Sequence, residues 1–310
     1  MSVGHQMTPR LEIICIGKEL LMGKMVNLNA HWLAKRATTL GFDVTRILTV
    51  TDDIDEIATA VQEAMQRHPR FIITTGGLGP TYDDKTLKGI AKSTGRKLAI
   101  SQQALRQIDE IYRKRIETRR SDFSEEELRR FERTLAEHER GHFSPYTLRV
   151  ATIPEGSRIV LNPNLKTGGL AVIMELDSTT LISFPGVPGE VEAIFEERIV
   201  PMFREVAGEV TFLEKSLDLK GVFEGRLSPL IDQVMAENPQ VYIKSNLKGD
   251  VRRDGIELYL STTDENPSVA ENNLNKALTR ITQLLQDKDG RLNLHQPSST
   301  PGSRASSEST

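Results

Sequence analysis

The chain of 310 residues contains little cysteine, few aromatic residues and no long hydrophobic run. Cys15 is its one cysteine, so no internal disulfide can form and a reducing compartment is expected. Aromatic residues make up 5% of the chain and hydrophobic residues 38%, which is enough for a sizeable core. No stretch is long enough to span a bilayer, and the first ten residues lack the apolar centre of a signal peptide. We therefore expect a soluble, cytoplasmic protein.

A strong excess of charge is also absent. The chain has 40 Lys and Arg residues against 43 Asp and Glu residues, which is a formal net charge of -3. A nucleic acid would favour a basic chain and an anionic membrane surface would favour basic patches. Neither is therefore expected as a partner.

The first third of the chain alternates between predicted strands and helices. Apolar runs predict strands at 11–17, 42–50 and 70–75. Helical spacing of apolar residues predicts helices at 27–40, 51–68 and 84–94. Asp52 is expected to be the N-cap of the second of these helices. Short links between strands and helices are typical of an α/β fold, here a doubly wound, mostly parallel sheet covered on both faces.

Residues from about 101 to 141 interrupt this alternation with a densely charged stretch. We expect two helices inserted as an arm, with a capping box from Ser124 to Glu127. The α/β pattern then resumes with "RVATIP", "GSRIVLNP", "LAVIMEL" and "TLISFPGVPGEVEAIFEERIVPMF". The charged stretch is therefore predicted to be an insertion and not a domain of its own.

A domain boundary is predicted near Ala207, where a small α+β unit begins. In that unit a helix is expected to start at Pro229 with Ser228 as its cap. The polar, Ser-rich end is expected to be disordered. The predicted division is a flexible terminus at 1–9, the α/β domain at 10–207, the small domain at 208–290 and a disordered tail at 291–310.

The segment "ITTGGLGPTYDDKT" follows the third predicted strand and is the most informative loop. Its glycines leave the backbone amides open to an anion such as phosphate; they are Gly76, Gly77 and Gly79. Thr74 and Thr75 could add hydroxyl donors. Asp83 and Asp84 would repel a phosphate unless a divalent cation lies between them, although an aspartate there could also be a helix cap. The loop is neither a Walker A loop nor a dinucleotide-binding turn, so the reaction stays open.

Other predicted strand ends carry residues that would meet at the same crevice. These residues are Glu19 and Asn29 after the first strand, Asp52 after the second, Asn162 and Gly169 in "NPNLKTGG", and Gly186 in "FPGVPGE". Turns are rich in Gly, Asn and Asp for conformational reasons, so each residue alone is a weak indication. Their joint occurrence at strand ends is more informative.

Four motifs in this order, "GKELLMGKMVNLNAHWLA", "VTDDIDEI", "ITTGGLGPTYDDKT" and "FPGVPGEVE", resemble the N-terminal domain of the CinA family of competence/damage-inducible proteins. That domain belongs to the molybdopterin-binding superfamily of MoaB and MogA, and the resemblance covers roughly residues 10–205. The small unit after Gly208 resembles the KH-like domain of CinA proteins. It lacks the Gly-x-x-Gly clamp of nucleic-acid-binding KH domains.

The resemblance implies metal-dependent hydrolysis of a nucleotide pyrophosphate. ADP-ribose is the family's example, and a similar domain of FAD synthases hydrolyses FAD. In MoaB and MogA the same fold binds molybdopterin, so a protein of molybdenum cofactor biosynthesis is an alternative, as is a nucleotide binder without turnover. CinA proteins often carry a nicotinamide mononucleotide deamidase domain. We expect no deamidase activity here, because the chain ends in a polar tail before such a domain.

In the enzyme hypothesis Asp84, Asp52 and Glu19 are catalytic, and Asp84 binds the metal together with Asp83. The metal is expected to be Mg²⁺, Mn²⁺ or Co²⁺, with potassium as a further candidate, and molybdopterin is the ligand in the alternative. The expected substrate-binding residues are Asn29, Thr74, Thr75, Gly76, Gly77, Gly79, Asn162, Gly169 and Gly186. A homo-oligomer, a dimer or a trimer, is expected because the superfamily commonly assembles in this way.

Several positions depart from the family pattern. Lys18 stands where Asp or Asn is usual, and Lys85 stands where a small apolar residue is usual. The loop that the family writes Asn-Pro-x-Gly-x-Ala-Pro-Gly differs here at Leu165, Thr167 and Gly168. Because this loop is expected to touch substrate, the identity of the substrate stays open.

Overall fold

The computed structural model describes residues 8–79, 81–163, 169–220, 222–247 and 255–289. The chain divides into two compact units, Met1–Ala207 and Gly208–Thr310, and each is described by itself. The expected tail at 291–310 and all but the last two residues of the expected flexible terminus lie outside the described residues.

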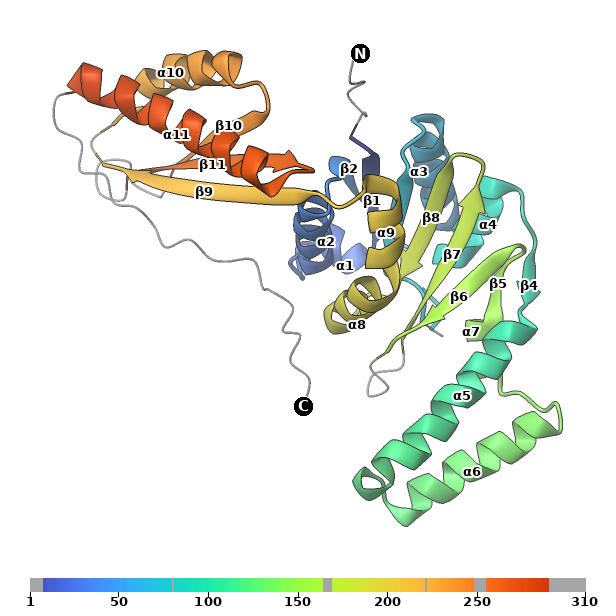
Figure 1. The fold of residues 1–310 in the computed structure, drawn as a ribbon. Helices are drawn as coiled ribbons and strands as arrows, with labels where there is room; N and C mark the ends of the chain where they lie inside the picture. Colours follow the sequence, from blue (N-terminus) through green and yellow to red (C-terminus); the bar gives the residue numbers. More distant parts are fainter. Residues whose placement is uncertain (1–7, 80, 164–168, 221, 248–254, 290–310) are drawn as a thin grey trace. The chain divides into compact units, whose positions relative to one another are not determined.

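The first unit is built on a six-stranded sheet with the strand order β2-β1-β3-β8-β7-β6 (Figure 1). Its strands are β1 (Arg10–Ile16), β2 (Asp43–Val50), β3 (Phe71–Thr75), β6 (Ser157–Leu161), β7 (Leu170–Leu176) and β8 (Thr179–Phe184). The first four strands in that order run parallel, whereas β7 is antiparallel to both of its neighbours. The prediction of a mostly parallel α/β fold is confirmed.

Helices cover both faces of this sheet (Figure 1). The helices of one face are α2 (Leu28–Thr39), α8 (Pro188–Ile194), the π-helical segment η2 (Phe195–Ile199) and α9 (Val200–Ala207). Those of the other face are α3 (Ile54–Gln66) and α4 (Thr86–Thr94). Because β3 is buried along its whole length, Phe71 and Ile73 enter the first core and Ile72 enters the second.

The packed side chains explain why these elements hold together. In the first core Phe71 stacks on Phe203 of α9, with ring centroids 4.4 Å apart. Cys15 is fully buried in the same core, as its apolar run predicts, and burial raises the pKa of its thiol. The free cysteine therefore belongs to the core packing and not to a reactive site.

The N-caps of two helices differ from the predictions. The N-cap of α3 is Asp53 and not Asp52, because the Asp53 carboxylate accepts hydrogen bonds from the amides of Asp55 and Glu56. Helix α4 begins at Thr86, with Lys85 in the N-cap position, so neither Asp83 nor Asp84 caps it. The three predicted site aspartates are therefore not used as helix caps.

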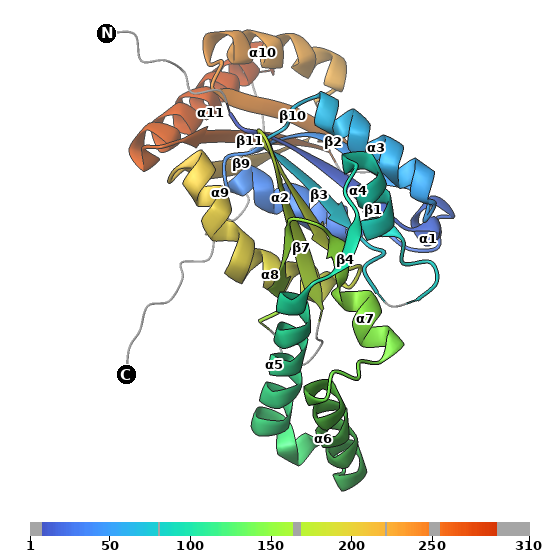
Figure 2. The ribbon, with the colours of Figure 1, turned by 90° about the vertical axis from the view of Figure 1, so that its right-hand side faces the viewer.

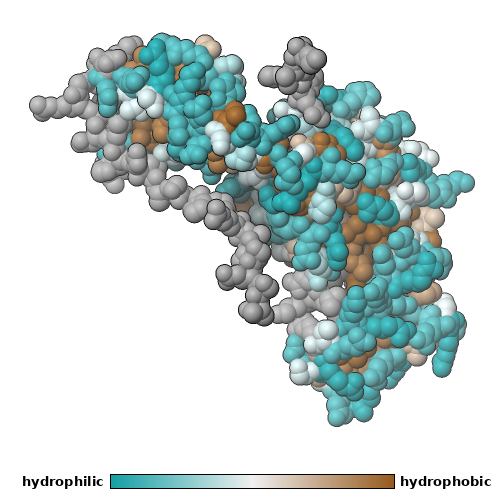
Figure 3. Space-filling view, in the orientation of Figure 1, coloured by the Kyte–Doolittle hydropathy of each residue, from teal (hydrophilic) through white to brown (hydrophobic). Residues whose placement is uncertain are grey.

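A helical arm is inserted between β4 (Leu98–Ile100) and β5 (Thr152–Pro154), which pair as a short antiparallel ribbon. The inserted elements are α5 (Gln102–Arg119), η1 (Arg120–Asp122), α6 (Glu125–Glu139) and α7 (Pro145–Ala151). Helices α5 and α6 extend away from the sheet in both ribbon views (Figures 1 and 2), and their visible surface is mainly hydrophilic (Figure 3). The predicted capping box of Ser124 and Glu127 is present.

Helix α7 is one of the elements that the sequence pattern missed, together with α1 and β4. The first half of "RVATIP" completes α7, and only its second half is strand β5. Ser144 caps α7 through the Thr147 amide, and Pro145 occupies its first position, which suits a residue without an N–H donor. The cap and the proline therefore set the start of a helix that apolar alternation alone does not reveal.

The second unit consists of a three-stranded antiparallel sheet with the order β10-β11-β9 and two helices on one of its faces (Figure 1). Its elements are β9 (Thr211–Leu219), α10 (Glu224–Glu237), β10 (Val241–Leu247), β11 (Ile256–Asp264) and α11 (Pro267–Asp289). The prediction that a helix starts at Pro229 is wrong, because α10 already includes the fully buried Leu227 and Pro229 lies inside it. No helix that the structure describes is both long and apolar enough to cross a membrane.

Candidate active site

The carboxyl ends of the parallel strands bring most of the predicted site loops to one edge of the sheet. Strands β1, β2, β3 and β8 end there, and each is followed by a loop with predicted site residues. The antiparallel pair β6–β7 reverses twice, so the end of β6 at Leu161 and the start of β7 at Leu170 reach the same edge. This edge is the usual ligand crevice of open α/β sheets.

The glycine loop after β3 is held in place through its backbone. The Gly76 amide donates to the Phe184 carbonyl at 3.1 Å, and the buried Thr86 hydroxyl donates to the Gly76 carbonyl at 2.8 Å. Gly76 has a φ angle of 98°, and a Cβ atom there would lie 2.2 Å from the Ile16 carbonyl oxygen. Gly77 also has a positive φ, 65°. Both positions therefore require glycine for conformational reasons, and the Gly76 amide, predicted to face a phosphate, is already bonded to the Phe184 carbonyl.

Hydrogen bonds of the Asn29 and Thr75 side chains connect α2, the end of β3 and the loop after β8. The Asn29 side-chain amide donates to the Thr75 hydroxyl and to the Gly186 carbonyl, both at 2.9 Å. The Thr75 hydroxyl donates in turn to the Pro185 carbonyl at 3.0 Å. These side chains therefore hold α2, β3 and the loop after β8 together. Thr74 is fully buried on the opposite face of the sheet, away from this network.

Asp83 and Asp84 meet at one hydroxyl group. The Thr81 hydroxyl lies 2.5 Å from Oδ1 of Asp83 and 2.6 Å from Oδ2 of Asp84, and the Thr81 amide donates to Asp84 at 2.7 Å. One hydroxyl hydrogen can serve only one of the two carboxylates at a time. The bond from Thr81, the backbone amide of Asp83 and nearby Lys85 hold the pKa of Asp83 below its ordinary value. Both negative charges are thus concentrated at the end of the glycine loop.

Asp52 and Glu19 lie beside the end of β1. Oδ2 of Asp52 accepts a hydrogen bond of 2.8 Å from the backbone amide of Lys18, at the start of the one-turn helix α1 (Lys18–Leu21). The Glu19 carboxylate folds back over Gly17, where a Cβ atom would lie 2.4 Å from its Oε1. Lys18 departs from the family pattern in its side chain, but it uses only its amide here. Any residue except proline could make the same bond at that position.

The loop between β6 and β7 is closed by a backbone bond from the Asn162 amide to the Gly169 carbonyl at 3.0 Å, and the Asn162 side chain is buried. The altered positions Leu165, Thr167 and Gly168 lie outside the described residues. Gly169 packs against Glu190 of α8, where a Cβ atom would lie 2.2 Å from Oε2. Glu190 is a buried carboxylate that the sequence reasoning missed, although it ends the quoted motif "FPGVPGE".

A comparison with family models shows the family to which the chain belongs. Residues 12–205 match the family model described as a probable molybdopterin binding domain. The chain belongs to this family. The match confirms the resemblance to the MoaB and MogA superfamily and is consistent with a CinA-like N-terminal domain.

Relatives of this molybdopterin-binding-domain protein can be aligned with most of its length. A protein of Aeropyrum pernix is 36% identical over 241 residues, which is 78% of this chain and 80% of the relative. A protein of Metallosphaera sedula is 32% identical over 282 residues, which is 91% of this chain and 96% of the relative. The solved structure of the protein CinA from Thermoplasma acidophilum is 31% identical and covers 62% of this chain and 98% of its own, with a TM-score of 0.48.

The donor set of the domain fits a hard divalent cation at Asp83 and Asp84. No group of three or more His, Cys, Asp or Glu side chains gathers into a metal-binding cluster within the described ranges, so Asp52 and Glu19 do not join this pair. Mg²⁺ is usually held by one or two carboxylates together with substrate phosphates, and a pair is enough for that arrangement. Oδ1 of Asp84 accepts no hydrogen bond from the described residues, which leaves its lone pairs for a ligand.

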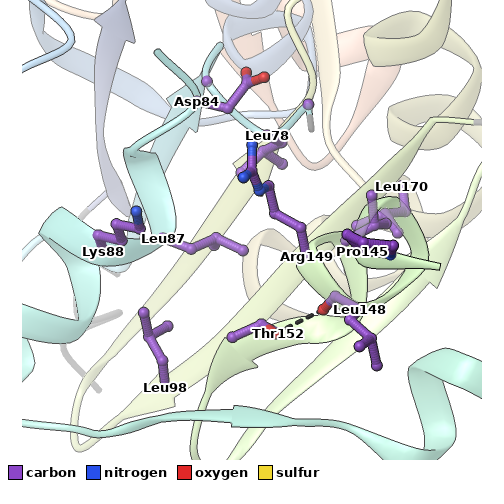
Figure 4. Close-up of a pocket in the computed structure, with 13 residues that line it drawn as sticks. Leu78, Asp84, Leu87, Lys88, Leu98, Pro145, Leu148, Arg149, Thr152 and Leu170 are labelled. Carbon is purple, nitrogen blue, oxygen red and sulfur yellow. Dashed lines mark hydrogen bonds between the residues drawn. The ribbon is translucent and has the colours of Figure 1, made fainter. Parts of the chain in front are cut away.

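A pocket of about 380 Å³ opens beside the glycine loop, between α4 and α7 (Figure 4). Gly77, Leu78, Gly79 and Asp84 form its side toward the loop. Its other lining residues include Leu87 and Lys88 of α4, Leu98, Leu148 and Arg149 of α7, and Leu170. Sequence reasoning missed this pocket because its far wall is α7.

Proposed function

We propose that this protein is a metal-dependent hydrolase of nucleotide pyrophosphates. The observation that carries the proposal is the meeting of Asp83 and Asp84 at the Thr81 hydroxyl, next to a loop in which Gly77 and Gly79 bring no side chains. Two carboxylates beside an anion cradle would repel a phosphate by themselves. A divalent cation held by these two side chains removes that repulsion, which is why the arrangement suits a phosphate-containing substrate.

Each part of the loop has a separate task in this proposal. The amides of Gly77 and Gly79 bind the phosphate oxygens. The Gly76 amide is bonded to the Phe184 carbonyl, and Gly76 contributes the positive φ angle that this turn requires. Asp84 and Asp83 hold the cation through the lone pairs that Thr81 does not use. When bound, the metal supplies positive charge that polarises the pyrophosphate.

Glu19 is the proposed general base. It follows β1, the strand directly beside β3, so its carboxylate lies at the same edge as the glycine loop. Water attacks one phosphorus atom, the bond from that phosphorus to the bridging oxygen breaks, and the other phosphate leaves with that oxygen. The proton of the attacking water passes to Glu19. Asp52 positions Glu19 through its bond to the Lys18 amide.

The test is turnover of ADP-ribose and of FAD with Mg²⁺, Mn²⁺ and Co²⁺, with the product nucleotides measured by chromatography. The proposal expects product only when a divalent metal is present, and none after chelation. The variant Asp84→Asn is the matched control, because it keeps the size of the side chain and removes its charge. Absence of turnover with either substrate under all three metals would overturn the proposal, and tight nucleotide binding in that case would identify a non-catalytic binder.

The family to which the chain belongs favours a second candidate, a pterin-binding protein of molybdenum cofactor biosynthesis. The pocket with leucine side chains beside the glycine loop suits a flat ring with an attached phosphate. Protein purified from cells that make molybdopterin should then carry a pterin, detected by its fluorescence after oxidation. Bound pterin in equal molar amount, without turnover of ADP-ribose or FAD, would favour this candidate over the hydrolase.

A further inference from the structure

The pocket beside the glycine loop is continuous with the proposed phosphate site. Gly77, Gly79 and Asp84 belong to both, so a group attached to a phosphate on the loop enters the pocket next. Figure 4 shows Arg149 extending from α7 toward Leu78 and Asp84 across this space. The pocket is therefore lined both by a residue of the inserted region and by the glycine loop at the edge of the sheet.

The lining divides into an apolar part and a cationic part. The leucines that face the pocket are Leu78, Leu87, Leu98, Leu148 and Leu170. Apolar walls with a few placed polar groups are typical of sites for flat heterocyclic ligands. Arg149 and Lys88 bring positive charge to the same space. Of these two, Arg149 can bind a phosphate through two parallel N–H groups, whereas Lys88 can act only as a point charge.

The backbone that carries Arg149 is fixed on both sides. Ser144 caps the start of α7, and the Thr152 hydroxyl donates to the Leu148 carbonyl at 2.6 Å. The Ala151 carbonyl accepts a bond of 2.9 Å from the Ser101 amide, and the Ala151 side chain is fully buried. A side chain on such a backbone loses less conformational freedom on binding than one on a free loop.

We infer that the pocket is a subsite for a nucleoside monophosphate group, in which the leucine walls hold the base and Arg149 pairs with the phosphate attached to it. This inference rests on the proposed function, because it assigns the nucleotide half of a pyrophosphate substrate. Arg149 is a positioning residue of this subsite, and the glycine loop binds the phosphate that is attacked. This subsite predicts tighter binding of a nucleotide than of inorganic pyrophosphate, which has nothing to place between the leucines.

The test is a calorimetric titration with AMP, which has no pyrophosphate bond and is bound without turnover. Arg149→Ala should weaken AMP binding about tenfold or more, the loss expected for a charge-assisted hydrogen bond, and Arg149→Lys should weaken it less. Adenosine, which lacks the phosphate, should bind equally to wild type and Arg149→Ala. Arg149 is exposed, so its replacement should not unfold the protein. Arg133→Ala, an exposed arginine of α6, is the matched control and should bind AMP as wild type does.

Steady-state kinetics distinguish a loss of substrate binding at this subsite from a loss of the chemical step. For ADP-ribose, Arg149→Ala should raise KM about tenfold and leave kcat within about threefold, since the lost contact is present before the reaction. The Asp84→Asn protein should lose turnover but still bind AMP, and the further change Arg149→Ala should weaken that binding. This result would support the subsite even if no hydrolysis were found. Wild-type protein that does not bind AMP would overturn the inference. So would Arg149→Ala protein that binds AMP as tightly as wild type.

Discussion

The loops after β2 and β3 each carry two adjacent aspartates, yet the structure uses the two pairs differently. After β2, Asp52 binds the Lys18 amide and Asp53 caps α3, so both carboxylates bind backbone amides of neighbouring elements. After β3, Asp83 and Asp84 share the hydroxyl of Thr81 in their own loop, and one oxygen of Asp84 accepts no bond from the described residues. Both pairs keep carboxylate oxygens that accept no bond from the described residues, so the pairs differ in their partners. The first pair binds amides at the starts of two helices, and the second binds the hydroxyl and the amide of one residue of its own loop.

The difference shows that the sequence Asp-Asp does not define a metal site by itself. What distinguishes the second pair is the glycine backbone in front of it, which brings no side chains and offers amides to an anion. The first pair follows "TVT", and its partners are amides in the first turns of α1 and α3. Four substitutions test this contrast, and they follow in the order of the effect expected from each.

Asp84→Asn should have the largest effect. It keeps an oxygen for the bond from the Thr81 amide but removes the charge that the cation requires. We expect kcat/KM for ADP-ribose to fall at least about 100-fold, since even outer partners of metal ligands commonly account for 10- to 100-fold. Unchanged thermal unfolding would show that the fold is retained. Full activity of this variant would remove the distinction between the two loops.

Gly76→Ala should have the next largest effect, and it acts on stability. The new Cβ would lie 2.2 Å from the Ile16 carbonyl oxygen at a φ of 98°, so the free energy of unfolding should fall by about 1–3 kcal/mol. Urea unfolding would measure it. Gly186→Ala is the matched control, because its Cβ would meet only the Gly76 Cα, at 3.7 Å. An equal loss in both variants would mean that the backbone of the β3 loop is not specially constrained.

Asp52→Ala should have a moderate effect on turnover. It removes the acceptor for the Lys18 amide, so α1 and the Glu19 carboxylate lose a fixed position. We expect kcat for ADP-ribose to fall about tenfold while the affinity for Mg²⁺ is unchanged. Asp52→Asn keeps an acceptor and should lose less activity. If instead Mg²⁺ binding were lost, Asp52 would belong to the metal site and the assignment of the two pairs would be wrong.

Asp53→Ala should have the smallest effect, a modest fall in melting temperature without a change in KM. The amides of Asp55 and Glu56 hold the pKa of Asp53 below its ordinary value of 3.8. A lowered folded-state pKa stabilises the protein above the ordinary value, and this contribution is lost as the pH falls through the lowered pKa. The difference in melting temperature between Asp53→Ala and wild type should therefore be present at pH 7 and shrink below about pH 4. A difference that stayed constant would argue against the cap.

The sequence predicted those features that depend on local signals. Fully buried strands such as β3 read as continuous apolar runs, and the glycine loop is visible because conformation and chemistry both require glycine there. Contacts between residues far apart in the sequence could not be predicted in this way. Arg149 faces the pocket because the chain returns from an insertion of some fifty residues, and no periodicity connects α7 to Gly79. Likewise, Asp52 does not cap α3 because its carboxylate accepts the bond from the Lys18 amide at the start of α1, which is distant in sequence.

The β4–β5 ribbon affects how the length of the inserted segment can change in evolution. It pairs Leu98–Ile100 with Thr152–Pro154, so the inserted arm leaves and re-enters the domain at one place. Closing a loop whose ends are already together costs little more as the loop grows, about 0.6 kcal/mol for each doubling of length. Helices α5 and α6 are therefore a place where length can change over generations while α7 and the other walls next to the glycine loop keep their positions.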